Sequence, residues 1–262
     1  MLFVRRQRRL AEPLLDVRLF AGRSFSAMLI GLSLYGLVGA SSMLFITQFL
    51  QSVAGLTPFD TALCLLPGMV AGTAGATLSP LLGRVVRPAY LIGGGVLGVA
   101  AIFAWFTQLD QGSSPVVLIV GFALMGLFEG PLLSLGTNLV ISGAPSEKAG
   151  SAASMAQVAN EAGGALGVAI MGSIGAAVYV SRLASAPPAA QENVASAVET
   201  ASRLPPAAAE ALLTAAARAA FVDGMTVFAG VSVAVLVVAA VFIVAVLRRV
   251  PPTGAPAEIG SQ

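Results

Sequence analysis

The amino-acid sequence predicts an all-α integral membrane protein with six transmembrane helices. Of its 262 residues, 57% are hydrophobic and only 10% are charged, whereas an average soluble domain is about 25% charged. Long apolar runs also recur along the chain, separated by short polar or glycine- and proline-containing stretches. A soluble fold of this size could not hide so much apolar surface, so a bilayer has to cover it.

The six apolar runs have the length that a membrane requires. A bilayer core of about 30 Å needs about 20 apolar residues in a helix. The uncharged stretch QSVAGLTP separates the first two runs, and the loop SGAPSEKAG closes the fourth. We expect the six helices at residues 24–50, 60–83, 89–108, 115–141, 150–179 and 224–247.

The segments around these helices differ in composition. We expect a basic cytoplasmic segment at residues 1–23, and the first five helices within 24–180. An Ala/Pro-rich extracytoplasmic segment at 181–222 carries two weak helical patterns. The sixth helix falls within 223–249, and a disordered cytoplasmic tail occupies 250–262. At the outer surface, Asp60 and Asp223 are expected to start helices, where an acid complements the helix dipole.

The basic residues predict the orientation in the membrane. Six spans put both termini on one side, and that side would hold eleven of the fourteen Arg and Lys residues. Basic residues concentrate on the cytoplasmic side of membrane proteins. We therefore expect a multi-pass protein of a bacterial cytoplasmic (inner) membrane with both termini in the cytoplasm. The three basic residues on the outer side would be Arg182, Arg203 and Arg218.

The sequence gives no sign of a cofactor, a metal or an enzymatic site. It has no histidine and one cysteine, Cys64, which excludes an internal disulfide and weighs against a zinc or iron–sulfur site. Nothing resembles a nucleotide-binding loop or a nucleophile with its base. We expect no enzyme, no cofactor and no nucleic-acid partner.

The fifth helix contains one ionisable side chain, Glu161, among residues 150–179. A carboxylate at the centre of a membrane helix costs about 2.5–3.5 kcal/mol on insertion scales, so such an acid is usually functional. A purely structural, hydrogen-bonded acid is the alternative. On nearly the opposite side of the helix, Gly163 and Gly167 form a G-x-x-x-G pattern, which predicts close packing against another helix.

A second acid, Glu129, lies in the fourth helix, followed by Gly130-Pro131, which should loosen the helical hydrogen bonding. Glu129 precedes the end of its helix by twelve residues, and Glu161 follows the start of its own by eleven. Since a short loop joins the two helices, both acids should lie about 17 Å deep. Two carboxylates at one depth could share a proton. We expect Glu161 and Glu129 to be the proton-coupling residues.

Uncharged polar side chains accompany these acids and are candidates for a substrate cavity. For each alone, a hydrogen bond between helices is an alternative explanation. The five candidates are Tyr35 and Gln48 in the first helix, Asn138 in the fourth, and Gln157 and Asn160 in the fifth.

Three segments resemble one known family. They are PLLDVRLFAGRSF (residues 13–25), ITQFLQSVAGLTPFDTALCLLPG (46–68) and APSEKAGSAASMAQVANEAGGALGVAIMGSIGAAVY (144–179). Together they resemble the C-terminal half of a major facilitator superfamily transporter of the fourteen-helix drug:proton antiporter family. The resemblance implies two inverted three-helix repeats and export of a hydrophobic or cationic small molecule in exchange for protons.

The resemblance also assigns residues. In quaternary-ammonium pumps of this family the thirteenth helix bears two acids four residues apart. Glu161 matches the second acid, and Gln157 replaces the first, which argues against efficient handling of dications. By family analogy, the first and fourth helices of each half line the central cavity, which would turn Tyr35 and Glu129 toward substrate.

The family has fourteen helices and this chain has six. The resemblance therefore implies a missing N-terminal half, either lost by truncation of the reading frame or encoded separately. Two alternatives remain at this point: a six-helix permease subunit of an ATP-driven exporter, and a non-functional transporter remnant.

Overall fold

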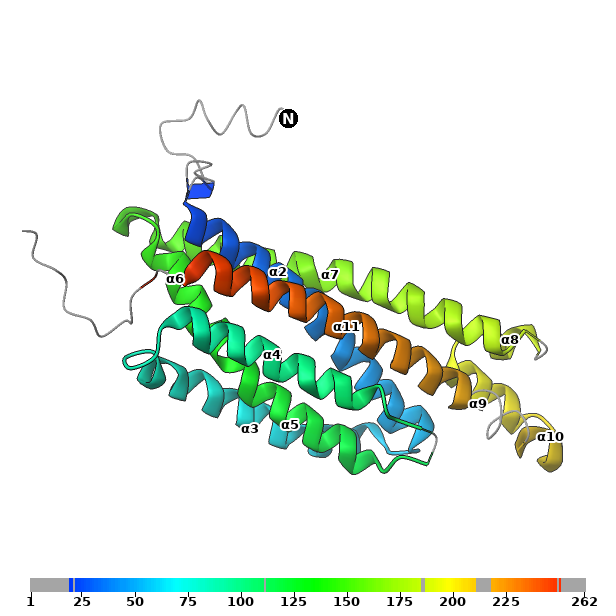
Figure 1. Cartoon of the computed structure of the whole chain (residues 1–262). Coiled ribbons are helices and arrows are strands. Elements are labelled where there is room, and N and C mark those ends of the chain that lie inside the picture. The colour runs from blue at the N-terminus through cyan, green and yellow to red at the C-terminus, as the bar shows by residue number, and fades with distance from the viewer. Residues whose placement is uncertain are drawn as a thin grey trace, which may run out of the picture.

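A computed structural model describes residues 19–20, 22–110, 112–184, 187–210, 218–248 and 250. The predictions for the basic segment before residue 19 and for the tail after residue 250 lie outside these residues. Within the described part, six helices are long and apolar enough to cross a membrane, which confirms the predicted fold class. They run up and down in one bundle (Figure 1).

The first four spans follow the predicted order. The first is α2 (Arg23–Gln48), continued by a π-helix, η2 (Phe49–Val53), and then come α3 (Pro58–Leu82) and α4 (Pro88–Phe106). The fourth span has three parts: α5 (Pro115–Pro131), the π-helix η3 (Leu132–Gly136) and α6 (Thr137–Ser142). The change to π-helix directly after Pro131 is the interruption predicted at Gly130-Pro131.

The remaining spans are α7 (Ala149–Arg182), which follows a short 3₁₀ turn, η4 (Ser146–Lys148), and α11 (Arg218–Leu247). Between them, residues 187–210 form three short helices, α8 (Pro188–Gln191), α9 (Val194–Ser202) and α10 (Pro206–Glu210). We call the end of the bundle that carries α8–α10 the loop end. The opposite end, where α2 begins and α11 ends, is the terminal end (Figure 1).

The starts of α3 and α11 test the roles predicted for Asp60 and Asp223. Asp60 lies in the first turn of α3, where its backbone N–H donates to the Thr57 hydroxyl at 3.1 Å, as predicted. The prediction for Asp223 is wrong. Because alanine and arginine favour helix, α11 begins at Arg218, five residues before Asp223, and the Asp223 carboxylate instead pairs with Arg182 Nε at 3.1 Å.

The helices pair as two three-helix repeats would. The first repeat is α2, α3 and α4, and the second is the α5–α6 span, α7 and α11. The most extensive contacts join α2 to α7, α3 to α5, and α4 to α11. The first helix of each repeat thus packs on the second helix of the other, and the two third helices pack together. Exchange of two inverted repeats about a pseudo-two-fold axis gives this pairing.

Glycines permit the close approach of α2 to α7 and of α3 to α5. A Cβ atom at Gly163 would fall on the backbone carbonyl of Ser33, and one at Gly167 on that of Leu37. The predicted G-x-x-x-G seam is therefore confirmed, with α2 as its partner. Small residues at such positions let helix backbones approach in a bilayer, where packing replaces the hydrophobic effect.

The α3–α5 pairing uses a second glycine seam that the sequence analysis missed. A Cβ atom at Gly126 would fall on the carbonyl of Gly68, and one at Gly130 would meet the backbone of Gly75. Both helices therefore touch along their backbones, close to Glu129.

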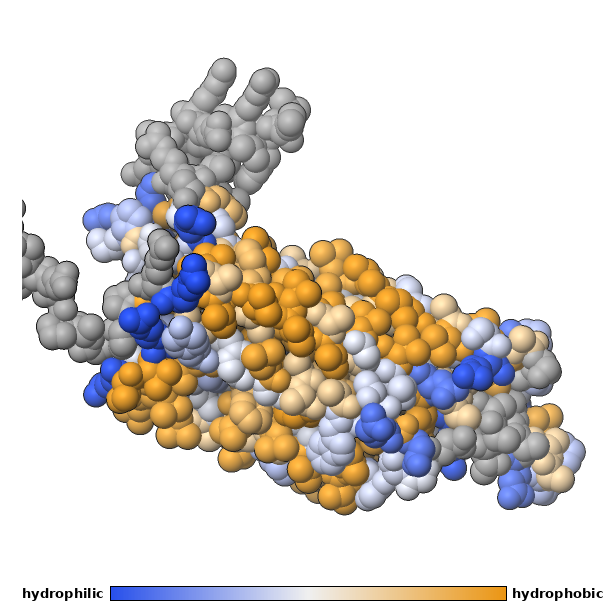
Figure 2. Space-filling model, viewed as in Figure 1, coloured by the Kyte–Doolittle hydropathy of each residue, from blue (hydrophilic) through white to orange (hydrophobic). Residues whose placement is uncertain are grey.

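Aromatic side chains hold the third helices to α2. The rings of Phe45 (α2) and Phe228 (α11) stack at 4.6 Å, and Phe103 (α4) meets Phe228 edge to face at 5.5 Å. All three are buried. Outside this core, the visible surface is apolar along the middle of the bundle, and hydrophilic residues gather towards its two ends (Figure 2), as a bilayer requires.

Candidate functional site

Tyr35 and Glu129 meet between the first helices of the two repeats. Tyr35 is buried on α2, and its hydroxyl donates a hydrogen bond to the carboxylate of Glu129 on α5. Gly72 of α3 faces the same carboxylate, since a Cβ atom there would lie 3.6 Å from Glu129 Oε1. Glu129 therefore sits where three helices converge.

Glu161 is bonded within its own helix. On α7, Gln157 Nε2 donates to Glu161 Oε1 at 2.8 Å, one turn apart. Both side chains are on the exposed face of α7, away from the Gly163–Gly167 seam. Gln157 therefore holds the Glu161 carboxylate from the preceding turn of the same helix.

One cavity of about 290 Å³ brings the two acids together. Glu129 and Tyr35 line it from one side, and Asn160 and Glu161 from the other. The Asn160 Oδ1 atom is buried and accepts no hydrogen bond from the described residues. The remaining wall is small or apolar, formed by Gly36, Gly39, Ala40, Leu133 and Gly164.

A second hollow, of about 410 Å³, continues this cavity toward α3. It shares Tyr35, Gly39, Glu129 and Leu133 with the first. The two hollows therefore form one groove that runs from α3 past Glu129 to Glu161 on α7. We call it the acidic groove.

The acidic groove also contains residues that the sequence analysis did not single out. From α3 it is lined by Met69, Gly72 and Thr73. A signal was available: Gly68 and Gly72 repeat the four-residue spacing of Gly126 and Gly130. Two glycine pairs with the same spacing predict that α3 packs closely against α5. Since Thr73 follows Gly72 and Glu129 precedes Gly130, such packing would bring Thr73 near Glu129.

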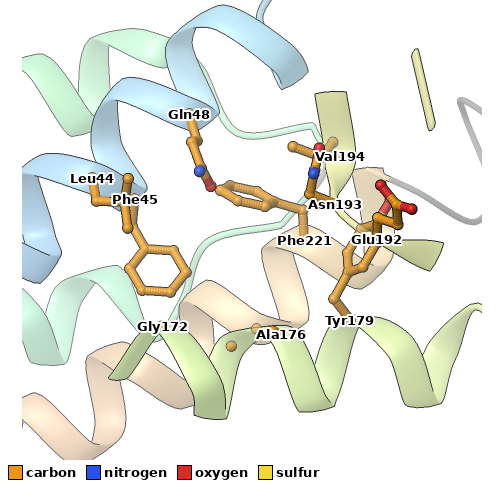
Figure 3. Close-up of a pocket in the computed structure, with 12 residues that line it drawn as sticks. Leu44, Phe45, Gln48, Gly172, Ala176, Tyr179, Glu192, Asn193, Val194 and Phe221 are labelled. Carbon is orange, nitrogen blue, oxygen red and sulfur yellow. The ribbon is translucent and has the colours of Figure 1, made fainter. Parts of the chain in front are cut away.

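Two predicted cavity residues lie elsewhere. Gln48 is thirteen residues beyond Tyr35, about 20 Å along the helix, and lines a hollow at the loop end together with Glu192 and Phe221 (Figure 3). Asn138 lies in α6, beyond the π-helix, and lines a hollow with Pro80 and Pro88 toward the terminal end. The structure does not bring either residue to the two acids.

The acidic groove offers two carboxylates that a proton or a cation could neutralise. Neither acid forms an ion pair with any other described residue. A carboxylate in a low-dielectric region is stabilised by a proton or by a positively charged ligand. Within the same residues, His, Cys, Asp and Glu form no group of three that could hold a metal ion.

Fold and site together define a multi-pass α-helical membrane protein with an acidic groove in the middle of its bundle. Residues 3–168 match the family model of the major facilitator superfamily. The chain belongs to this superfamily of membrane transporters.

Curated relatives agree with this assignment. The chain is 34% identical to the multidrug efflux pump LfrA of Mycolicibacterium smegmatis, over 95% of the chain and 50% of LfrA. It is 29% identical to the tetracenomycin C resistance and export protein of Streptomyces glaucescens, over 98% of the chain and 50% of that protein. It is 31% identical to the methyl viologen resistance protein SmvA of Salmonella typhimurium, over 83% of the chain and 46% of SmvA. The chain spans about half the length of the curated relatives it matches.

Proposed function

We propose that this chain forms the C-terminal half of a proton-coupled exporter of hydrophobic or cationic small molecules. It would work in the inner membrane with an N-terminal half. The superfamily membership and the names of the relatives, which are efflux, resistance and export proteins, support this proposal. So does the chain's coverage of about half of each relative.

One observation carries the mechanism: Glu129 and Glu161 line the same cavity from different helices. A proton on these acids and a bound cation neutralise the same negative charge, so each disfavours the other. Proton binding from one side of the membrane would then release a cationic substrate, and substrate binding from the other side would release the proton. This competition is the elementary step of antiport.

The surroundings of the two acids suggest different roles. Glu161 is exposed on the face of α7, where a substrate between the two halves would reach it, and Gln157 orients its carboxylate. Glu129 is more enclosed and bonded to Tyr35, which suits a proton carrier. Asn160 offers a free acceptor for a donor group on the substrate. Gln48 and Asn138 would contact substrate only near the two ends of its path.

The orientation is part of the proposal. Both termini would lie in the cytoplasm, because this orientation places eleven of the fourteen basic residues there. The loop end, with α8–α10, would then face outward.

The test is export by the reassembled transporter. The chain is expressed with the N-terminal half of a relative in a pump-deficient bacterium, and efflux of the fluorescent cation ethidium is followed at several external pH values. We expect Glu161→Gln and Glu129→Gln to reduce efflux at least tenfold and to flatten its pH dependence. Glu199→Gln, an acid on α9 outside the groove, is the matched control. Efflux at the wild-type rate and with the wild-type pH dependence in both groove variants would refute the proposal.

The same assay separates the alternatives. A permease subunit of an ATP-driven exporter would stop when ATP is depleted and continue when the proton gradient is collapsed. A remnant would export nothing with any N-terminal half. The proposed antiporter requires the opposite response to the two treatments.

A further inference from the structure

Three exposed arginines gather at the terminal end of the bundle. Arg84 and Arg87 lie in the loop that joins α3 to α4, and Arg248 directly follows α11. The Arg87 Nη1 atom donates to the backbone carbonyl of Arg248 at 3.2 Å. The α3–α4 loop therefore lies against the end of α11, although the two segments are far apart in the sequence (Figure 1). We call Arg84, Arg87 and Arg248 the arginine cluster.

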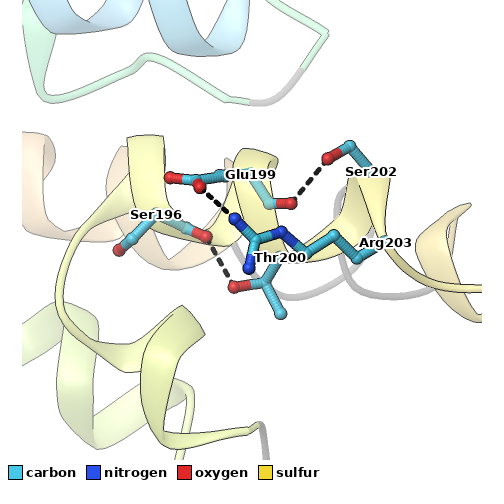
Figure 4. A network of polar contacts seen from close by, with 5 residues as sticks. All are labelled: Ser196, Glu199, Thr200, Ser202 and Arg203. Carbon is cyan, nitrogen blue, oxygen red and sulfur yellow. Dashed lines mark hydrogen bonds and ion pairs between the residues drawn. The ribbon is translucent and has the colours of Figure 1, made fainter.

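The positive charge of the arginine cluster is not compensated by the described part of the chain. No carboxylate there forms an ion pair with any of the three arginines. Glu147, at the same end of the bundle, accepts from the Ser146 hydroxyl at 3.0 Å. Arg203, at the loop end, shows the contrasting arrangement, because Glu199 binds it at 2.5 Å (Figure 4). An anion that binds the arginine cluster therefore has to come from outside these residues.

Exposed apolar side chains lie directly beside the arginine cluster. Leu81 and Leu82 end α3 with 55% and 50% of their surface exposed, and Val85, between the arginines, is 83% exposed. In Figure 2, hydrophilic and apolar side chains likewise adjoin one another at this end. Such a mixture fits the boundary between lipid head groups and acyl chains, where an arginine keeps its stem in the apolar layer and its charge at the head groups.

An apolar hollow of about 370 Å³ opens next to the same loop. Pro80, one helical turn before Arg84, and Pro88, directly after Arg87, both line it. The opposite wall comes from η3 and α6 and is formed by Leu135, Asn138, Leu139, Ile141 and Ser142. We call it the terminal hollow. Anchoring of the chain in the membrane explains basic residues at this end, but it does not require an apolar hollow beside them.

We propose that the arginine cluster and the terminal hollow together bind one anionic phospholipid. Its phosphate would lie on the arginines, because guanidinium groups match phosphate oxygens in pairs. Part of an acyl chain would fill the terminal hollow. Basic pockets between membrane helices bind anionic lipid head groups in this way.

The apolar surroundings favour a lipid over a soluble anion. Inorganic phosphate would neutralise the arginines but would leave Leu81, Val85 and the terminal hollow in contact with water. A phospholipid covers both kinds of surface at once. The inference does not rest on proton exchange, since the terminal hollow shares no lining residue with the acidic groove.

The charge is tested without disturbing the loop. Arg87 is left in place, because its side chain holds the loop to α11. Arg84→Gln and Arg248→Gln each remove one positive charge, and each should weaken lipid binding about fivefold. The double variant should weaken it about 25-fold. Arg203→Gln is the matched control, because Glu199 already compensates that charge, and it should leave the affinity unchanged.

The terminal hollow is tested by adding bulk. Ser142 lines it and is exposed, so Ser142→Trp places a large ring at the position expected for the acyl chain. Ser173→Trp is the matched control, because Ser173 is an exposed serine in the membrane helix α7 that lines neither the terminal hollow nor the acidic groove. Circular dichroism and thermal unfolding confirm that both variants fold.

The experiment measures lipid binding to the purified 262-residue chain in a neutral detergent by native mass spectrometry. The probes are phosphatidylglycerol, which is anionic, and phosphatidylcholine with the same acyl chains, which has no net charge. We expect one phosphatidylglycerol molecule to bind at least tenfold more tightly than phosphatidylcholine. Binding should be weaker in the arginine variants and in Ser142→Trp, and unchanged in Arg203→Gln and Ser173→Trp. Inorganic phosphate at millimolar concentration should not displace the lipid.

Four results would overturn the proposal. They are equal binding of the two lipids, wild-type binding by Arg84→Gln/Arg248→Gln, wild-type binding by Ser142→Trp, and displacement of the lipid by inorganic phosphate. The last result would mean that the arginines bind a soluble anion. None of them bears on export through the acidic groove, whose residues are unchanged in these variants, and loss of export in the groove variants leaves the lipid site untouched.

Discussion

The hydroxyl of Tyr35 donates a hydrogen bond to the carboxylate of Glu129, which is 94 residues away in the sequence. The two residues lie on α2 and α5, the first helices of the two repeats. The bond therefore joins the two repeats at the acidic groove. A change in the protonation of Glu129 would therefore act directly on α2, the helix that carries Tyr35.

A double-mutant cycle tests this bond. Tyr35→Phe keeps the ring and removes the donor, and Glu129→Leu removes the acceptor. Side-chain hydrogen bonds between membrane helices contribute about 0.6 kcal/mol on average and up to about 1.7 kcal/mol. We expect a coupling free energy of about 1 kcal/mol in unfolding measured in detergent micelles. Additive effects of the two substitutions, within about 0.3 kcal/mol, would contradict the bond.

The α2–α7 seam predicts that one methyl group added at Gly167 lowers the stability of the protein. In Gly167→Ala the added Cβ falls on the carbonyl of Leu37, so the helices have to separate. Overpacking of this kind costs about 1–3 kcal/mol. Gly172→Ala, on the same helix but in open space, should cost nothing. Thermal unfolding of both variants decides the point, and equal stabilities would argue against the seam.

Gln157 predicts a gain of function. Gln157→Glu restores the first of the two acids that the resembled pumps carry, one turn before Glu161. Two neighbouring carboxylates attract a dication more than a monocation. In the reassembled transporter, we expect Gln157→Glu to raise export of methyl viologen relative to ethidium at least threefold, an increase of the order that one exposed charge pair supplies. Gln157→Asn serves as the control of unchanged charge. An unaltered ratio in Gln157→Glu would show that this position does not face substrate.

The Arg182–Asp223 pair predicts a small effect. Its side chains are 64% and 44% exposed, and exposed ion pairs contribute at most about 1 kcal/mol. Asp223→Asn should therefore lower the free energy of unfolding by less than about 1 kcal/mol, and the difference should fall as salt is added. A larger loss that persists in high salt would mean that the pair is shielded from solvent.

Much of the fold followed from apolar length alone. Each span was predicted because a run of about 20 apolar residues is typical of a membrane helix. The predicted starts at residues 60, 89 and 115 lie within two residues of the observed starts of α3, α4 and α5, each of which is a proline. The start of α11 was missed because alanine-rich sequence continues a helix beyond the membrane. Hydropathy does not report that extension.

The candidate site could be predicted only in part. Glu129 and Glu161 were matched in depth by counting from their common loop, and the structure places them at one cavity. Their shared face could not be predicted, because it depends on how α5 and α7 pack around α2. The same count along α2 separates Gln48 from Tyr35 by about 20 Å. Asn138 follows the π-helix η3. Because a π-helix has more residues per turn than an α-helix, the direction of the Asn138 side chain could not be counted from Glu129 with a 3.6-residue period.

The central claim is that the acidic groove exchanges protons for substrate, and proton release upon substrate binding tests it most directly. The purified transporter, reassembled from both halves in weakly buffered detergent solution, is titrated with ethidium while a pH-sensitive dye reports released protons. We predict about one proton released per ethidium bound if the two acids share a proton, and none from Glu129→Gln/Glu161→Gln. Undiminished proton release by the double variant, or ethidium binding by the wild type without any release, would contradict the account.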